Sequence, residues 1–308
     1  MLFVLGGMML AGLTACSGDD DTATNGSAPQ TADDGVKVRR LTITEVEGDA
    51  AEARQALTRA SLTENGGLTA SWTAGDKLTY CNLMRMQKNG EEDVPVSGNL
   101  KATTTAATSQ FTGDVVCDAG DYLAVVYPAA TFTTNSQYTI ALTEQDGTLA
   151  RLATRFHYVY GKALVNSVTD ATADATMPKM KSLLTVCKFS FVDKSSNAAI
   201  SIKTLTISYG GSGGDADKYP QTATVSCDIN TEQADVHATG NESSEPLTIN
   251  CQTAQAAVYV ALLPTAEQRT FRFTVTDGSG KTYSGTAKAK LTEGEYVVAT
   301  GLKLTQNE

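Results

Sequence analysis

Apolar and polar residues alternate with a period of two along most of the chain from about residue 36 onward. The runs at 41–44, 68–72 and 77–80 have this pattern, and a turn signal, Ala-Gly-Asp at 74–76, separates the last two. Strict alternation of this kind predicts strands with one buried face. Further strands of the first half are expected at 122–127, 138–142 and the aromatic run 156–160.

The segment 169–178 is small and polar, and we interpret it as the boundary between two domains. A second series of alternating runs follows at 183–192, 200–209, 222–229, 247–251, 257–263, 270–276, 281–291 and 296–304. Short strands at this spacing, with turn signals between them, indicate a β-sandwich. The pattern therefore predicts an all-β chain of two tandem sandwiches, at 37–172 and 173–308. The segment 52–57 is a possible short helix that fits a loop equally well.

Composition narrows the function classes. Of 308 residues, 41% are hydrophobic and 19% are charged, which is enough apolar material for a packed core. The net charge is −10. Binding to a duplex requires a basic face that displaces counterions, so we expect no nucleic-acid partner.

The N-terminal 15 residues are almost entirely apolar, and they are too few to span a bilayer as a helix. They are typical of a secretory signal peptide. The run ends in Leu-Thr-Ala-Cys16, which resembles a bacterial lipoprotein box, and the resemblance implies a lipid on Cys16 and an outer-membrane, cell-surface location. An ordinary signal peptide with a chance cysteine is the alternative. Residues 16–36 lack apolar periodicity and are interpreted as a flexible tether.

An acidic cluster comes directly after Cys16. It consists of Ser17, Gly18, Asp19, Asp20 and Asp21. It resembles the surface-export signal of Bacteroidetes lipoproteins, and the alternative is a solvated tether without a sorting role.

The remaining cysteines argue against a disulfide framework. Their number is odd, and no two stand at CxxC spacing, which disfavours zinc and redox sites. Strand-type residues flank most of them, so they are expected to be small core hydrophobes. They are Cys81, Cys117, Cys187, Cys227 and Cys251.

Several segments, taken in order, are similar to the fimbrillin family of Bacteroidales. The first is Thr58-Arg59-Ala60 followed by Trp72-Thr-Ala-Gly-Asp76, and the second joins Phe111-Thr-Gly113 to Tyr122-Leu-Ala-Val-Val-Tyr-Pro128. The third combines Leu-Pro264, a strand over 271–276 and Leu291-Thr-Glu-Gly-Glu-Tyr296. Each motif alone is ordinary strand-and-turn sequence, and their order carries the resemblance over nearly the whole chain from Cys16.

The resemblance implies two transthyretin-like β-sandwich domains behind a lipoprotein signal. It also implies that an arginine-specific protease removes an early strand, and that a C-terminal strand of another subunit fills the groove. An exposed sheet edge above an apolar trough supplies the physical basis for such an exchange. The removable strand would be 38–46, with cleavage after Arg59 or, second, Arg54. Its expected residues are Val38, Leu41, Ile43 and Val46.

The donor strand would be 296–304, and its expected pocket-filling residues are Tyr296, Val298, Leu302 and Leu304. Only residues 305–308 follow the last expected strand, so we expect no separate donor hairpin of the kind that the stalk pilins of the family have. A tip, anchor or accessory subunit is therefore nearly as well supported as a stalk subunit.

Sites for catalysis are not apparent, and we expect no enzyme activity, cofactor or metal. The glycine run 210–214 lacks the Gly-Lys-Ser/Thr of a phosphate-binding loop. His157 lies among aromatics and His237 in a polar stretch. Trp72 could belong to a sugar platform, but its place before a turn favours a core anchor. Two functions remain: a fimbrial subunit assembled by strand exchange for adhesion and biofilm formation, or a monomeric surface adhesin for glycan or host protein.

Overall fold

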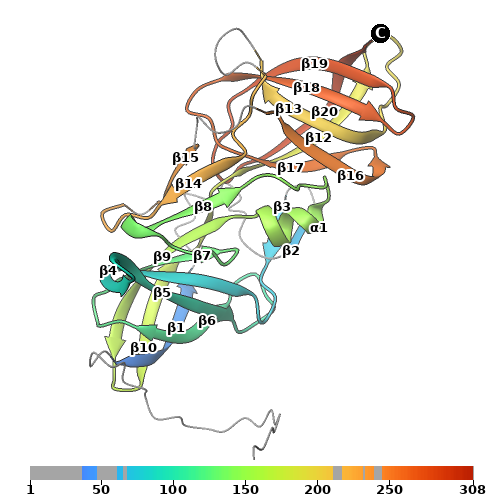
Figure 1. The fold of residues 1–308 in the computed structure, drawn as a ribbon. Coiled ribbons are helices and arrows are strands. Elements are labelled where there is room, and N and C mark those ends of the chain that lie inside the picture. Colours follow the sequence, from blue (N-terminus) through green and yellow to red (C-terminus); the bar gives the residue numbers. More distant parts are fainter. Residues whose placement is uncertain are drawn as a thin grey trace, which may run out of the picture.

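The computed structural model describes residues 37–46, 61–64, 68–210, 217–231, 233–238 and 245–307. Strands make up almost all of the regular structure, arranged as two bodies of sheet stacked end to end (Figure 1). The predicted all-β fold class is confirmed, with sheets of the sandwich or barrel kind.

Seven strands of the N-terminal half close into a ring. In order around the ring they are β10 (Thr172–Pro178), β1 (Val38–Val46), β6 (Gln110–Val116), β5 (Glu92–Ala102), β4 (Lys77–Asn89), β7 (Tyr122–Tyr127) and β9 (Val159–Val168). β10 also pairs with β9, and this pairing completes the closure. The short β11 (Lys181–Ser182) pairs with β9 as well. We refer to these seven strands as the barrel.

Two local expectations are corrected in this half. The segment 169–178 contains β10, in which Ala173, Ala175 and Met177 alternate with exposed residues and are buried in the barrel core. Residues 172–182 therefore pair with the N-terminal sheet, although the sequence predicts that the second domain begins at residue 173. The run 156–160 is only partly extended: a helical turn, α1 (Leu149–Arg151) with η3 (Leu152–Phe156), precedes β9.

The C-terminal half is a two-layer sandwich. One layer contains β16 (Leu247–Gln255), β13 (Ile202–Tyr209), β18 (Arg269–Asp277) and β19 (Thr282–Ala289), and the other contains β20 (Tyr296–Gln306), β12 (Thr185–Asp193) and β17 (Val258–Leu262). Two residue pairs join β19 to β20, so the layers meet along a short corner. Phe189 and Phe191 from one layer pack on Phe273 from the other at 5.2 and 5.6 Å between ring centroids.

Two smaller sheets lie between the halves. β8 (Gln137–Ala141), after η2 (Thr134–Ser136), pairs with β14 (Thr222–Ser226), which pairs with β15 (Asp235–Ala238). The other is the hairpin of β2 (Ser61–Glu64) and β3 (Leu68–Ser71). Because β8 comes from the first half and β14 from the second, one hydrophobic core runs through both halves, and a second core fills the barrel.

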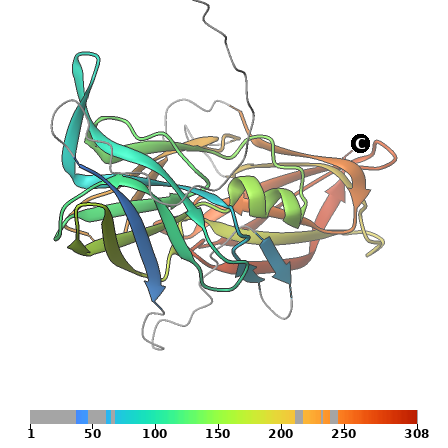
Figure 2. The same ribbon diagram turned by 90° about the horizontal axis from the view of Figure 1, so that it is seen from below.

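A long hairpin made by the ends of β4 and β5 projects from the barrel (Figure 2). Met84 and Met86 on β4 are more than half exposed there.

Candidate functional site

The strand expected to be removable, β1, lies inside the barrel with a neighbour on each side. It runs parallel to β10, with Arg40 opposite Thr172 and Val46 opposite Pro178. It runs antiparallel to β6, with Val38 opposite Val116 and Thr44 opposite Gln110. Loss of β1 would therefore expose two sheet edges with unpaired N–H and C=O groups.

The inward face of β1 is apolar in its centre, as predicted. Leu41 and Ile43 are fully buried. They share a core cluster with Trp72, which lies edge-on to Phe111 at 4.9 Å and to Tyr127 at 5.6 Å between ring centroids. The interpretation of Trp72 as a core anchor is confirmed, since the side chain is fully buried.

A carboxylate occupies the next inward position of β1. Glu45 is 7% exposed. Its Oε2 accepts a hydrogen bond from Trp72 Nε1 at 3.3 Å, and its Oε1 accepts one from the backbone N–H of Met180 at 3.2 Å. A buried donor without a partner costs about 1–3 kcal/mol. Any strand that occupies this position in place of β1 therefore needs a hydrogen-bond acceptor here.

Basic side chains hold the first half of β1. Arg39 Nε donates to the carbonyl of Thr169 at 2.7 Å, and its Nη1 donates to the carbonyl of Cys117. Lys37 pairs with Asp170 at 2.6 Å. Arg40 lies on the outer face, with its guanidinium 3.4 Å from Asp114. We expect Arg39 and Arg40 to be poor protease sites, because a protease must bind an extended, unpaired backbone.

The expected cleavage residues Arg54 and Arg59 lie outside the described residues, as do Cys16, Ser17, Gly18 and Asp19 to Asp21. Described structure ends at Val46 on β1 and resumes at Ser61 on β2, so the two arginines fall between two strands. Cleavage, lipidation and the export signal thus stay predictions.

A cluster of side chains around Glu64 holds β2, the strand that follows residues 47–60, in place. Glu64 at the end of β2 accepts hydrogen bonds from Lys188 Nζ at 2.7 and 2.8 Å. It also accepts from the hydroxyls of Tyr259, at 2.5 Å, and Tyr296, at 2.8 Å. These donors, with Lys188 first, lower the pKa of Glu64 from 4.5 to about 2. The three donors lie on β12, β17 and β20, so one carboxylate ties β2 to three strands of the C-terminal sandwich. We call this group the Glu64 cluster.

The expected donor strand is β20, and in this chain it belongs to the C-terminal sandwich. It runs parallel to β12, with Tyr296 opposite Val186 and Leu304 opposite Asp193. Leu304 is buried, whereas Val298 is 53% exposed. A register shift opposite Phe189 to Phe191 separates the two ends of the strand, which is why its expected pocket-filling residues differ in burial.

The described part of the chain offers few other candidates for a catalytic, metal-binding or membrane-spanning element. The five cysteines are buried, as predicted, and none of them is bridged. No group of three or more His, Cys, Asp and Glu there could hold a metal ion. No helix among the described residues is long and apolar enough to cross a membrane. His157 is buried, at 1% exposure.

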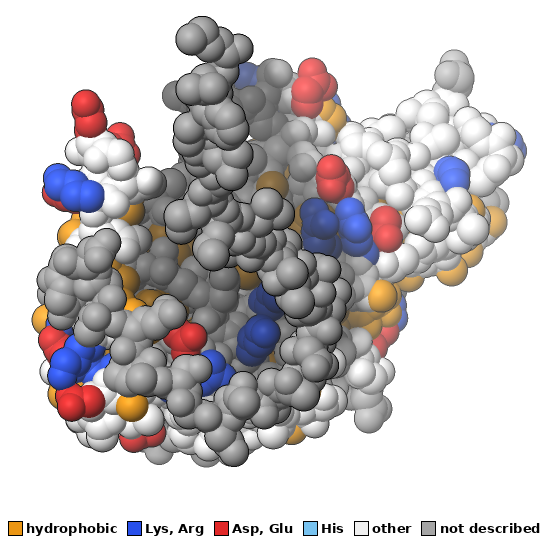
Figure 3. All heavy atoms as spheres, turned by 60° about the horizontal axis from the view of Figure 1, so that its bottom comes forward, with side chains coloured by type: hydrophobic (Ala, Val, Ile, Leu, Met, Phe, Trp, Pro, Cys, Tyr) orange, Lys and Arg blue, Asp and Glu red, His pale blue; other side chains and the backbone are white. Residues whose placement is uncertain are grey.

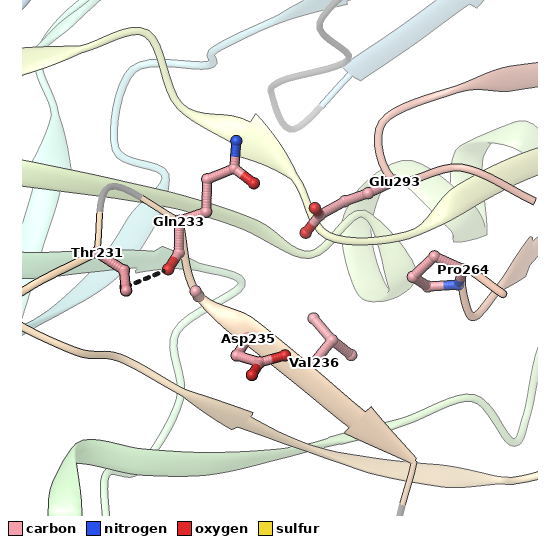
Figure 4. Close-up of a pocket in the computed structure, with 7 residues that line it drawn as sticks. Thr231, Gln233, Asp235, Val236, Pro264 and Glu293 are labelled. Atoms are coloured by element: carbon pink, nitrogen blue, oxygen red, sulfur yellow. Dashed lines mark hydrogen bonds between the residues drawn. The ribbon is translucent and has the colours of Figure 1, made fainter. Parts of the chain in front are cut away.

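One pocket of about 610 Å³ lies beside β15 (Figure 4). Asp235 and Glu293 both line it. Burial is the main cause that raises the pKa of Glu293 to about 7, with Lys181 opposing and Asp235 adding to the rise. Two carboxylates without a nucleophile or an ordered third ligand define no reaction, so the pocket is not assigned a function.

The surface around the barrel is of mixed charge. Acidic and basic side chains lie interspersed on the face seen in Figure 3.

Comparisons with known proteins address the fold. No family model and no curated protein matches the sequence. The chain is similar in structure to a candidate cell adhesion protein from Bacteroides uniformis, with TM-score 0.50, 16% identity and coverage of 84% of this chain and 98% of that one. A second candidate cell adhesion protein, from Bacteroides ovatus, has TM-score 0.49, 10% identity and coverage of 88% and 96%. A shaft pilin from Lactobacillus rhamnosus has TM-score 0.33, 9% identity and coverage of 88% and 98%. The first likeness establishes a shared fold.

Sequence reasoning missed Glu45 and Glu64, the two polar residues that organise this region. A glutamate at an inward position of an otherwise alternating strand is a weak signal for Glu45. Nothing in the sequence near Glu64 identifies its partners, because Lys188, Tyr259 and Tyr296 are more than 120 residues away along the chain.

Proposed function

We propose that the chain is a fimbrial subunit, exported as a surface lipoprotein and assembled by protease-triggered donor-strand exchange, with a role in adhesion and biofilm formation. The observation that carries the proposal is the position of β1. It is the first of the described strands, it fills a slot between β10 and β6, and the segment after it holds two arginines. The fold shared with a candidate adhesion protein supports a role in surface adhesion.

The pairing of β1 supports this mechanism. While β1 is attached, the ring is closed and offers no free edge between β10 and β6. Cleavage after Arg59, or after Arg54, leaves β1 held by hydrogen bonds and packing alone. An incoming strand that pairs with both edges and covers the same apolar trough then replaces it. We expect the donor to be 296–304 of another subunit, with Tyr296, Val298, Leu302 and Leu304 as its candidate contacts.

The test is limited digestion of the chain from residue 17 with an arginine-specific protease. The new N-terminus is read by mass spectrometry and the particle size by gel filtration. We expect a cut after Arg59 or Arg54, followed by growth into chains that resist dodecyl sulfate. Arg59→Gln should move the cut to Arg54. Arg40→Gln, a change within a strand paired on both sides, should leave the pattern as it is.

One observation favours a second function. Because β20 pairs with β12 from Tyr296 to Leu304, with one register shift, it must leave its own sandwich to act as a donor. A surface adhesin that binds glycan or host protein as a monomer avoids this cost. That function predicts a chain that resists the protease, or one that is cut and stays monomeric.

A further inference from the structure

We infer that the β1 slot recognises a polar side chain as well as two apolar ones, and that Gln306 of a second copy of this chain supplies it. The inference rests on the proposed function, and it adds a register and a specificity-determining contact. The requirement arises from the groups that Glu45 now satisfies. Trp72 Nε1 and the N–H of Met180 point at this position from two different elements, at 3.3 and 3.2 Å. Both lose an acceptor when β1 leaves.

The inward residues of β1 define what a replacement must carry. Leu41 and Ile43 are fully buried and Glu45 is 7% exposed, so the pattern is aliphatic, any residue, aliphatic, any residue, acceptor. The last strand of the chain has this pattern. Leu302-Lys-Leu-Thr-Gln306 aligns with Leu41-Thr-Ile-Thr-Glu45, with Leu and Thr identical at the first and fourth positions.

β1 and β20 also have the same kinds of neighbouring strand, one parallel and one antiparallel. β1 has a parallel neighbour, β10, on one side and an antiparallel neighbour, β6, on the other. β20 likewise lies between β12, which is parallel, and β19, which is antiparallel. A segment of β20 can therefore enter the β1 slot with both kinds of pairing preserved.

In its own subunit, Gln306 has no buried role. In its own sandwich Gln306 is exposed, at the end of β20 opposite Tyr283. In the β1 slot its carboxamide oxygen would accept the hydrogen bond that Glu45 now accepts. A carboxamide has one such oxygen and a carboxylate has two, so Gln306→Glu should fit at least as well as the natural residue.

The match covers only half of β1. Thr300 and Gly301 would take the places of Arg39 and Arg40, so the contacts of Arg39 with Thr169 and Cys117 would be lost. The register is thus set by 302–306. In this register Tyr296 and Val298 fall before the first residue of β1, so of the four expected donor contacts only Leu302 and Leu304 fill the slot. When residues 302–306 detach from their own sandwich, Leu304 loses its buried position there. The β1 slot of the second subunit must therefore bury Leu304 again.

The experiment compares assembly of the protease-cut chain, expressed from residue 17, as wild type, Gln306→Leu and Gln306→Glu. Because Gln306 is exposed in the subunit, both variants should fold like wild type, which unfolding curves before digestion will check. An unpaired buried donor predicts that Gln306→Leu needs at least about fivefold more protein for half-maximal assembly. Lys303→Gln, a change on the outer face of the same strand, is the matched control and should assemble like wild type.

Engineered cysteines test the register. Thr42 lies opposite Thr112 on β6, so Lys303 should take that place. Lys303→Cys combined with Thr112→Cys should form a disulfide between subunits. Lys303→Cys with Asp114→Cys, which corresponds to a shift of two residues, should not.

The outcomes distinguish a failure of the proposed function from a failure of the contact proposed for Gln306. If wild type is cut and does not assemble, the proposed function fails and this inference fails with it. If wild type assembles and Gln306→Leu assembles at the same concentration, or the Asp114 pair crosslinks in preference to the Thr112 pair, strand exchange stands and the contact proposed for Gln306 is wrong.

Discussion

The Glu64 cluster makes a quantitative prediction about acid stability. Glu64→Gln removes the charge that Lys188, Tyr259 and Tyr296 surround, with little change in shape. The folded state holds the pKa of Glu64 at about 2, against an ordinary 4.5, so folding favours the ionised carboxylate. Its contribution to stability is present above pH 4.5 and is lost as the pH falls toward 2.

The size of the contribution follows from the shift and the exposure. At ~1.4 kcal/mol per pH unit, a fall from 4.5 to about 2 sets an upper limit of about 3 kcal/mol. The Glu64 side chain is 29% exposed and Lys188 is 23% exposed, so solvent screens the pair. We therefore expect about 1 kcal/mol at neutral pH.

Urea unfolding of wild type and Glu64→Gln at a series of pH values measures this difference. The variant should be less stable by about 1 kcal/mol at pH 7, and the gap should close as the pH falls from 4.5 to 2. Glu267→Gln, on the exposed turn before β18, is the matched control and should show little difference at any pH. A gap for Glu64→Gln that stays constant between pH 7 and pH 2.5 would refute the assignment of the stabilisation to the charge.

Three further predictions concern the barrel and the core. Leu41→Ala should lower the free energy of unfolding by about 2–5 kcal/mol, whereas Thr42→Ala on the same strand should change it by less than about 1 kcal/mol; equal effects in urea unfolding would contradict the assigned faces. Glu45→Leu should cost about 2–4 kcal/mol because it leaves two buried N–H donors unpaired, and Glu45→Gln should cost less; the reverse order would exclude the acceptor role. The five buried cysteines should react negligibly with a thiol reagent at pH 8 in the native chain and should all react in denaturant. Burial shields these thiols and raises their pKa, to about 12 for Cys81. Rapid labelling of any of the five in the native chain would contradict this burial.

Local pattern predicted most of the strands and little of how they pair. β7 coincides with the expected 122–127, and β12, β13 and β18 lie within two residues of expectation at each end. All four are rich in residues of high β-propensity, and β13 and β18 also alternate between buried and less buried positions, whereas β7 is buried on both faces. β5 was missed because Pro95 and Gly98 interrupt its alternation, although the structure accommodates both.

The site could be predicted only as far as one strand reveals its own faces. The burial of Leu41 and Ile43 follows from alternation within β1. The neighbours of β1 do not, because β10 lies in a polar segment whose small residues are buried only after the barrel closes. The partners of Glu45 and Glu64 are set by that closure and by packing between the halves.

The closed ring has a consequence for the order in which the chain folds. Arg39 and Thr169, which meet where β1 joins β10, are 130 residues apart in sequence. Bringing the ends of so long a segment together costs about 4 kcal/mol of chain entropy before any contact repays it. A chain that emerges N-terminus first exposes β1 long before β10 exists. Among the described strands, the first to appear is therefore one of the last to be secured, and until β10 forms one edge of β1 has no partner.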